Sequence, residues 1–543
     1  MRASAIAVLV ASATLAGAAA PPAAQNPSTS TTAATPVPPP AQNPFESMAA
    51  VAPRNKIDDS VFGQLKRLNI RAASLSSDAV FVRRAYLDVI GTLPTGDEAR
   101  AFIEDQSPSK RTALIDRLLE RPEYADYWAM KWGDVLRIKS EFPINLWPNA
   151  VQAYHRWVKT AIRDNMPYDR FVRELLTQNG SNFRVAPVNF YRAVQSKDPQ
   201  TLASTVALTF MGTRTERWPK ERLTGMAAFF SQIGYKPTGE WKEEIVYFDP
   251  GKASTSSTAG APRLPVFPDG ATALIAAGQD PREVFAAWLI SPTNPWFART
   301  AANRVWYWLM GRGIIQEPDD IRPDNPPGNP ELLGYLEKEF VASRYDLKAL
   351  YRLILNSTTY QLSSMPQTAT PEAEAQFAHA IIRPLDAEVL VDALNQITGA
   401  GEEYQSAIPE PYTFVPPDLR SIALGDGSIT SAFLETFGRP PRDSGLASER
   451  NSRPTASQRL QLLNGGDVQR KIQQGPKMQA LLQAGGGQQV IVNLYLTILS
   501  RMPTDGEMKA TGTYVQSAGG NRRQAVIDVA WALINSAEFR YRH

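Results

Sequence analysis

The sequence predicts a mainly α-helical protein with little β structure, made of two helical domains that a linker rich in Pro, Ser and Thr joins. Apolar residues recur at helical spacing along most of the chain, so each helix would bury one face. Prolines and capping residues stand where these runs begin. The alternation typical of a half-buried strand is scarce, and only residues 244–248 (EIVYF) are predicted to be extended.

The beginning of the chain has the pattern of a secretory signal peptide, which we assign to residues 1–18. Arg2 precedes an apolar run over residues 5–15, and small residues follow at 16–18. The run is too short to span a bilayer, and no later stretch of about 20 apolar residues predicts a transmembrane span. We therefore expect an exported protein, located in the periplasm, at the cell surface or outside the cell.

Two low-complexity stretches divide the rest of the chain. Residues 19–53 are rich in Pro, Ala and Thr, a composition that cannot bury enough apolar surface to fold, and they are predicted to be a disordered tether. Residues 251–270 have a similar composition and are predicted to be a linker. The expected helical domains are then residues 54–250 and residues 271–543.

Capping signals place several helix ends. Asn329 stands before a run that begins with Pro330, and Thr504 with Glu507 has the pattern of a capping box. Asp386 is predicted to cap a helix over residues 387–398, which Gly399 would end in the left-handed conformation.

The chain contains no cysteine, and its only histidines are His155, His379 and His543. Without sulfur it cannot form disulfides, thiolate zinc sites, iron–sulfur clusters or a covalently attached c-type haem, and no cofactor is expected. The histidines have no second ligand at motif spacing, and no Gly-x-Ser-x-Gly elbow accompanies them. We therefore assign no catalytic residue.

The charges nearly balance, with 57 Lys and Arg against 54 Asp and Glu and a formal net charge of +3. Removing Arg2 with the signal peptide lowers this charge to +2. Proteins that bind nucleic acid present a basic footprint to the phosphates. The composition therefore predicts no nucleic-acid partner.

A proline-rich loop contains the densest group of oxygen ligands, namely Glu317, Asp319, Asp320 and Asp324. Hard cations need six or more oxygen ligands, so this loop is a candidate site for a divalent cation. Arg322 lies inside the same loop, however, and an Asp–Arg pair that pins an irregular loop is the commoner arrangement. The spacing does not fit an EF-hand.

A second candidate site is a group of arginines, Arg439, Arg442, Arg450 and Arg453. Guanidinium groups bind carboxylates and phosphates, so an anionic polymer or sugar could dock on them. The alternative, which we prefer, is an internal lattice of salt bridges with acids such as Asp443 and Glu449 that holds a proline-rich loop in place.

Several strings are more specific than helix patterning requires. The first half contains RRAYLD (83–88), GTLPT (91–95), MPYDRF (166–171) and GMAAFF (225–230). The second half contains NPWFAR (294–299), NRVW (303–306), FGRPPR (437–442) and LLNG (462–465). Together they resemble the planctomycete-type secreted cytochrome-like domain followed by its usual C-terminal partner domain, both of unknown function. The resemblance covers nearly all of residues 54–543.

The chain departs from that family at both of the family's cysteine motifs. The family has a Cys-x-x-Cys-His haem motif after a Phe-Leu-Gly turn, whereas here Phe210-Met211-Gly212 leads directly to Trp218, about a dozen residues short. The family's later Cys-x-Cys reads Leu446-Ala447-Ser448 here. The resemblance therefore implies a divergent member that has lost covalent haem and kept the scaffold.

These observations favour an exported binding or scaffold protein of the cell envelope, with a protein or glycan partner, over an enzyme. One alternative is a carboxylate-based hydrolase acting on envelope polysaccharide, in which a pair such as Asp319 and Asp320 would face a cleft with one raised pKa. Another is a redox protein with non-covalent haem. The partner and the oligomeric state do not follow from the sequence.

Overall fold

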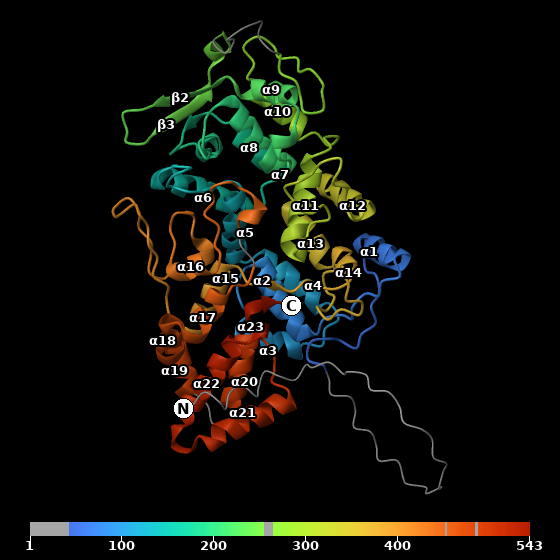
Figure 1. The fold of residues 1–543 in the computed structure, drawn as a ribbon, viewed down its shortest axis with the longest axis vertical. Coiled ribbons are helices and arrows are strands. Elements are labelled where there is room, and N and C mark those ends of the chain that lie inside the picture. The colour runs from blue at the N-terminus through green and yellow to red at the C-terminus, as the bar shows by residue number, and fades with distance from the viewer. Residues whose placement is uncertain (1–42, 255–263, 451–452, 484–486) are drawn as a thin grey trace. The chain divides into compact units, whose positions relative to one another are not determined.

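Helices dominate the structure because the chain repeatedly places a capping residue or a proline before an apolar run. The computed structural model describes residues 43–254, 264–450, 453–483 and 487–543, and in these ranges the chain forms 23 α-helices and five short strands (Figure 1). The prediction of a mainly α-helical protein with little β structure is confirmed. The predicted signal peptide, most of the predicted tether and residues 255–263 of the predicted linker lie outside the described residues.

The first nine helices belong to the part of the chain before the predicted linker. They are α1 (Lys56–Arg67), α2 (Asp78–Val89), α3 (Gly96–Glu104), α4 (Lys110–Leu119), α5 (Pro122–Val135), α6 (Pro148–Arg163), α7 (Tyr168–Thr177), α8 (Pro199–Met211) and α9 (Lys220–Ala227). Helix α2 is buried along nearly its whole length. Charged residues of α2 therefore need partners inside the protein.

A small antiparallel sheet consists of β1 (Gly180–Ser181), β2 (Ile233–Pro237) and β3 (Glu244–Phe248), in the order β1-β3-β2. Strand β3 is the predicted extended segment. Strand β2 was not predicted because it is short, contains a glycine and ends in a proline. Its backbone pairs with β3, with Ile233 opposite Phe248. A second pair joins β4 (Arg383–Pro384) to β5 (Tyr541–Arg542).

The remaining helices follow the predicted linker. They are α10 (Pro281–Leu289), α11 (Phe297–Met310), α12 (Pro330–Ala342), α13 (Leu347–Leu355), α14 (Pro371–Ala375), α15 (Ala387–Thr398), α16 (Ala432–Thr436), α17 (Ala456–Asn464), α18 (Gly466–Gln474), α19 (Pro476–Gln483), α20 (Gln488–Leu499), α21 (Asp505–Ser517), α22 (Arg522–Ile534) and α23 (Ala537–Arg540). The Asn329 side chain caps α12, and Thr504 with Glu507 forms the predicted capping box of α21.

Helix α15 has the predicted bounds, and Gly399 ends it with a φ of 76°. The predicted cap is wrong, because the Asp386 side chain makes no capping hydrogen bond. Its carboxylate instead accepts hydrogen bonds from the Lys131 ammonium and the Arg542 guanidinium, both at 2.8 Å. Bonds between opposite charges are stronger than bonds to a neutral amide, so buried cations outcompete the helix end for this side chain.

The two predicted domains share one hydrophobic core. Trp128 and Trp132 of α5 pack against Trp308 of α11, with ring centroids 5.5 and 5.3 Å apart. Arg84 of α2 donates hydrogen bonds to the carbonyl oxygens of Tyr360 and Leu362. Residues 45–543 accordingly form one compact unit.

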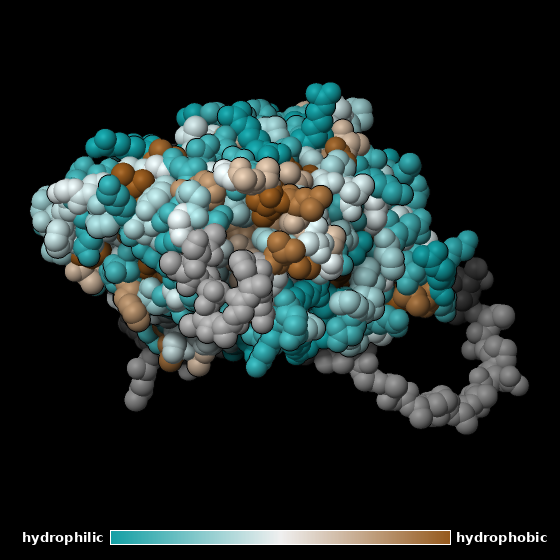
Figure 2. Space-filling model, turned by 90° about the horizontal axis from the view of Figure 1, so that it is seen from above, coloured by the Kyte–Doolittle hydropathy of each residue, from teal (hydrophilic) through white to brown (hydrophobic). Residues whose placement is uncertain are grey.

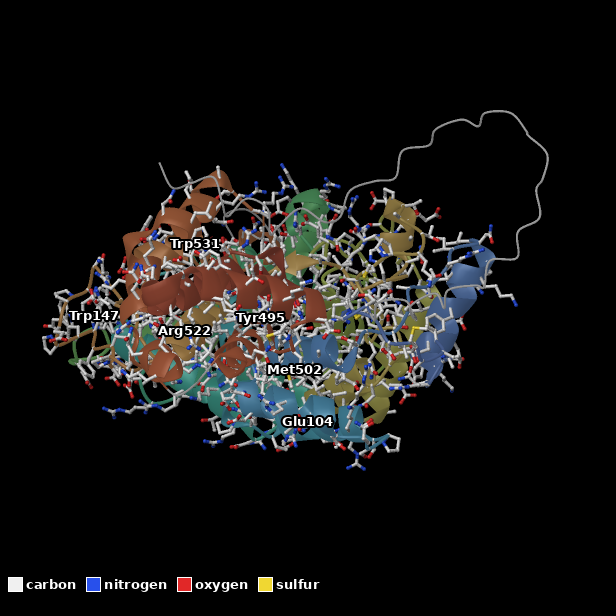
Figure 3. The ribbon with its side chains drawn as sticks, turned by 90° about the horizontal axis from the view of Figure 1, so that it is seen from below. Glu104, Trp147, Tyr495, Met502, Arg522 and Trp531 are labelled. Atoms are coloured by element: carbon white, nitrogen blue, oxygen red, sulfur yellow. The ribbon has the colours of Figure 1, made fainter. Side chains whose placement is uncertain are left out.

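The last helices pack around α20 and α22, which contact each other and carry Tyr495 and Trp531 (Figure 3). Arg501 follows α20 and donates hydrogen bonds to Glu507 of α21 at 2.7 Å and to Glu538 of α23 at 2.6 and 2.8 Å. This buried cation therefore joins three neighbouring helices.

The surface shown in Figure 2 is mainly hydrophilic, with hydrophobic residues in small groups. Such scattered apolar residues are normal on a folded protein. Within the described ranges, no helix combines the length and the apolar content needed to cross a bilayer.

Candidate functional site

A cleft of about 890 Å³ lies beside the short connection that follows α8, and we call it the outer cleft. Its walls are residues 213–222, the start of α11 and the proline-rich loop 315–327. Helices α8 and α11 contact each other and position these walls (Figure 1). The lining includes two tryptophans and five arginines, namely Trp218, Trp296, Arg214, Arg217, Arg222, Arg299 and Arg322.

The connection after α8 is held to the proline-rich loop by hydrogen bonds in both directions. Gly212 ends α8 with a φ of 57°, and the Thr213 hydroxyl donates to the carbonyl oxygen of Ile321 at 2.9 Å. The Ile321 N–H in turn donates to the Gly212 carbonyl at 2.8 Å. This connection is therefore fixed to the proline-rich loop.

Arginine and tryptophan side chains stack on one wall of the outer cleft. The Arg222 guanidinium lies 4.1 Å from the centroid of the Trp218 ring and 5.8 Å from that of Trp296. Burial lowers the pKa of Arg222. The Nε atoms of Arg214 and Arg222 are buried and have no hydrogen-bond partner in the described structure. This wall thus offers flat aromatic rings beside guanidinium groups.

The four acids of the predicted cation loop do not converge. Glu317 contacts Arg214 at 2.8 Å, Asp319 contacts Arg304 at 3.1 Å, and Asp320 and Asp324 both contact Arg322. Asp319 also accepts a hydrogen bond from the Ala447 N–H at 2.6 Å. The described residues contain no group of three or more His, Cys, Asp or Glu side chains that could hold a metal ion. These contacts favour the alternative in which Asp–Arg pairs pin the loop.

A second cavity, of about 110 Å³, lies deeper in the protein, and we call it the inner chamber. Leu446 lines both cavities. The charged residues that line the inner chamber are Lys131, Asp134, Arg304, Arg383, Asp386, Arg450 and Arg542.

Three of the four predicted arginines lie inside the protein around this chamber. Arg442 contacts Asp134 at 2.9 Å, Arg450 contacts Asp134 and Glu388 at 2.7 Å each, and Arg439 contacts Glu388 at 3.4 Å. These contacts correspond to the preferred interpretation, an internal lattice. Arg453 is exposed, whereas Arg439 and Arg442 are buried.

The expected acidic partners of those arginines were the wrong ones. Asp443 pairs with Lys139 at 2.6 Å, and Glu449 accepts hydrogen bonds from the backbone N–H groups of Asp443 and Ser444. The actual partners come from α5 and α15, which are distant in the sequence.

Sequence reasoning also missed five charged residues of this region, namely Asp88, Lys131, Arg383, Asp386 and Arg542. Asp88 contacts Arg383 at 2.9 Å and Arg542 at 3.2 Å. The sequence feature that could have identified them is a charged residue within an apolar run, such as Lys131 in the aromatic helix α5. Such a residue needs a buried partner, but its spacing does not say which one.

The charged groups of the chamber shift one another's pKa values. Burial lowers the pKa of Lys131 to about 8. Burial alone would raise the pKa of Asp386, but Lys131, Arg542 and Arg450 hold it well below its ordinary value. Asp386 is therefore ionised at neutral pH.

A third hollow, of about 630 Å³, is lined by residues of α15, the start of α3 and the loop 417–420. Burial raises the pKa of Asp392 in this cleft to about 6. The Asp392 carboxylate accepts hydrogen bonds from the N–H groups of Ser421 at 2.7 Å and Ile422 at 3.1 Å. It is the one acid in the described residues that combines a raised pKa with a position in one of these three hollows.

Comparison with known families finds one match in each half of the chain. Residues 56–231 match a domain described as a protein of unknown function, DUF1549 or PSCyt2. Residues 281–515 match a second one, DUF1553 or PSD1. The two domains follow in the expected order, and the chain lacks the cysteines of a haem motif. No curated protein and no solved structure matches the chain.

Proposed function

We propose that this chain, which belongs to the family that joins a DUF1549 domain to a DUF1553 domain, is an exported binding or scaffold protein of the cell envelope that holds an anionic glycan in the outer cleft. The observation that carries the proposal is the juxtaposition of tryptophan rings and arginines in an open cleft of about 890 Å³. Small-ligand sites have volumes of this order.

The chemistry of the lining supports a ligand that is both ring-shaped and acidic. The apolar face of a sugar ring packs against an aromatic side chain, and guanidinium groups bind carboxylate or sulfate oxygens. Of the five arginines, Arg214, Arg299 and Arg322 form ion pairs with carboxylates of Glu317, Glu337, Asp320 and Asp324. In the described residues Arg217 and Arg222 form no ion pair with a carboxylate. The guanidinium groups of Arg217 and Arg222 are therefore the ones that attract a negatively charged ligand.

Haem does not fit this cleft. Its lining contains no histidine, methionine, tyrosine or cysteine, the side chains that ligate haem iron. We therefore propose that the outer cleft binds a ligand and takes no part in electron transfer.

The test is binding of the full chain to an acidic polysaccharide, such as a polyuronate, and to a neutral glucan of equal length by isothermal titration calorimetry. We expect saturable binding of the acidic polymer that weakens as salt is raised. Trp241→Ala serves as the matched control, because Trp241 is 69% exposed and does not line the cleft. Equal binding of both polymers, or of neither, would contradict the proposal.

A second candidate function is acid–base hydrolysis in the third hollow. The specific observation that favours it is the Asp392 carboxyl, whose pKa of about 6 suits a proton donor near neutral pH. Release of reducing ends from envelope polysaccharide by the wild type, and its loss in Asp392→Asn, would support this candidate. Undiminished release in the variant would refute it.

A further inference from the structure

The ion pairs around the inner chamber form one connected network whose charges do not cancel. Contacts between 2.7 and 3.5 Å link it in the described residues. Its cations are Lys131, Arg383, Arg439, Arg442, Arg450 and Arg542. Its carboxylates are those of Asp88, Asp134, Asp386 and Glu388. Six cations against four carboxylates leave two positive charges without a counter-charge.

These groups are buried enough for the imbalance to matter. The side chains of Arg439 and Arg442 are 3% and 1% exposed, and that of Arg542 is 4% exposed. Charge buried without compensation is unfavourable, because the protein interior solvates it far less well than water does. The network therefore favours a bound anion.

The inner chamber is the place where such an anion fits. Its lining includes four cations of the network, Lys131, Arg383, Arg450 and Arg542, and two of its carboxylates, those of Asp134 and Asp386. Arg304 also lines the chamber and is paired with Asp319. A volume of about 110 Å³ is large enough for one tetrahedral oxyanion.

Hydrogen-bond donors remain available at the chamber. The Arg542 Nε is buried and lacks a partner in the described structure. The Lys131 ammonium carries three donors, and its hydrogen bond to Asp386 uses one of them. Asp386 also stands at the N-terminus of α15 without capping it, so the positive end of that helix lies beside the chamber.

We propose that the inner chamber binds a sulfate or phosphate group. The group is either a free inorganic ion or an ester carried by the ligand of the outer cleft, since Leu446 lines both cavities. Only the ester source rests on the proposed function. The free ion requires nothing from the outer cleft.

The experiment measures thermal unfolding of the full chain with sodium sulfate, sodium phosphate or sodium chloride at constant ionic strength. A parallel arm uses glucose 6-sulfate beside glucose. We expect sulfate or phosphate to raise the Tm by several degrees in a saturable manner, whereas chloride does not. A shift with glucose 6-sulfate at lower concentration than with inorganic sulfate identifies the ester source.

Variants assign the shift to the chamber. Lys131→Met removes one charge and three donors, and we expect its apparent Kd for the anion to rise at least tenfold. Arg173→Ala removes an exposed arginine of α7 that lines neither cavity and should leave the anion-dependent shift unchanged. If Lys131→Met does not fold, Arg383→Lys keeps the charge but loses the planar fork, and weaker binding is again expected.

Two results would overturn the inference. One is a wild type whose Tm responds to sulfate and phosphate no more than to chloride. The other is a folded chamber variant that keeps the full response. A chain that binds inorganic sulfate but no acidic polysaccharide would retain this inference and refute the proposed function, so the two failures are distinguishable.

Discussion

The outer cleft and the inner chamber are both rich in arginine, share Leu446 as a wall, and use the same side chain in opposite ways. In the outer cleft Arg217 is exposed and Arg222 stacks on tryptophan rings. Around the inner chamber Arg442 is fully buried and joins Asp134 to backbone carbonyl oxygens. Burial therefore separates an arginine that can meet a ligand from one that holds the fold together.

We expect the largest loss of stability from a substitution that breaks the ion-pair network of the inner chamber. Arg450→Met removes the cation that contacts Asp134, Asp386 and Glu388, and leaves buried carboxylates without this partner. We expect a loss of about 3–5 kcal/mol in the free energy of unfolding, measured by urea denaturation. Arg217→Met in the outer cleft is the matched control and should change stability by less than about 0.5 kcal/mol. Similar losses of stability in the two variants would show that the arginines of the two cavities contribute equally to the fold.

The next effect concerns binding in the outer cleft. Trp218→Ala removes the ring that stacks against Arg222, and we expect the affinity for an acidic polysaccharide to fall about tenfold, or about 1.4 kcal/mol. Calorimetric titration measures this change, and circular dichroism checks that the fold persists. An unchanged affinity would show that the polysaccharide does not bind at the wall formed by Trp218 and Arg222.

A smaller effect follows from His155, which lies close to the buried arginines. Burial and the charge of Arg442 lower the pKa of His155 to about 3, whereas the unfolded chain protonates near 6.5. The unfolded state thus takes up this proton first, so stability is lost as the pH falls from about 6.5 towards 3.

Because His155 is partly exposed, we expect its contribution between pH 6.5 and 5 to be about 1 kcal/mol. Urea denaturation at pH 7.5 and at pH 5.0 measures it. His155→Gln cannot titrate and should lose less stability over this interval than the wild type. Equal losses in the two proteins would show that the imidazole protonates normally in the folded state.

The smallest effect belongs to the proline-rich loop of the outer cleft. Arg322→Ala removes the partner of Asp320 and Asp324, both of which are at least partly exposed. Exposed ion pairs contribute little, so we expect less than about 1 kcal/mol of lost stability in thermal denaturation. A loss above about 2 kcal/mol would mean that the ion pairs of this loop stabilise the fold as strongly as those around the inner chamber.

Local sequence signals predicted much of the fold, but little of the network around the chamber. Helix α15 begins and ends where its flanking residues predicted, because capping is decided by residues a few positions apart. Asp386 departs from its predicted cap because its partners, Lys131 and Arg542, lie 255 and 156 residues away. Spacing along the chain carries no information about such pairs.

The two sites proposed from the sequence also show that nearby partners were predictable and distant ones were not. The acids of residues 317–324 bind arginines that include their own neighbour Arg322, which the sequence offered as the alternative. The arginines at 439, 442 and 450 found carboxylates on α5 and α15 instead of nearby Asp443 and Glu449. The outer cleft was not predicted, because its tryptophans and arginines come from segments about 80 residues apart that only the packing of α8 against α11 brings together.

Strand β5 has a consequence for how the chain reaches this state. Arg542 follows Asp88 by 454 residues and also contacts Asp386. A ribosome delivers residues in order, so a nascent chain cannot close these contacts until position 542 has emerged. Until then Asp88 has Arg383 as its cationic partner and Asp386 has Lys131, and the cation that joins the two acids is the last to be synthesised.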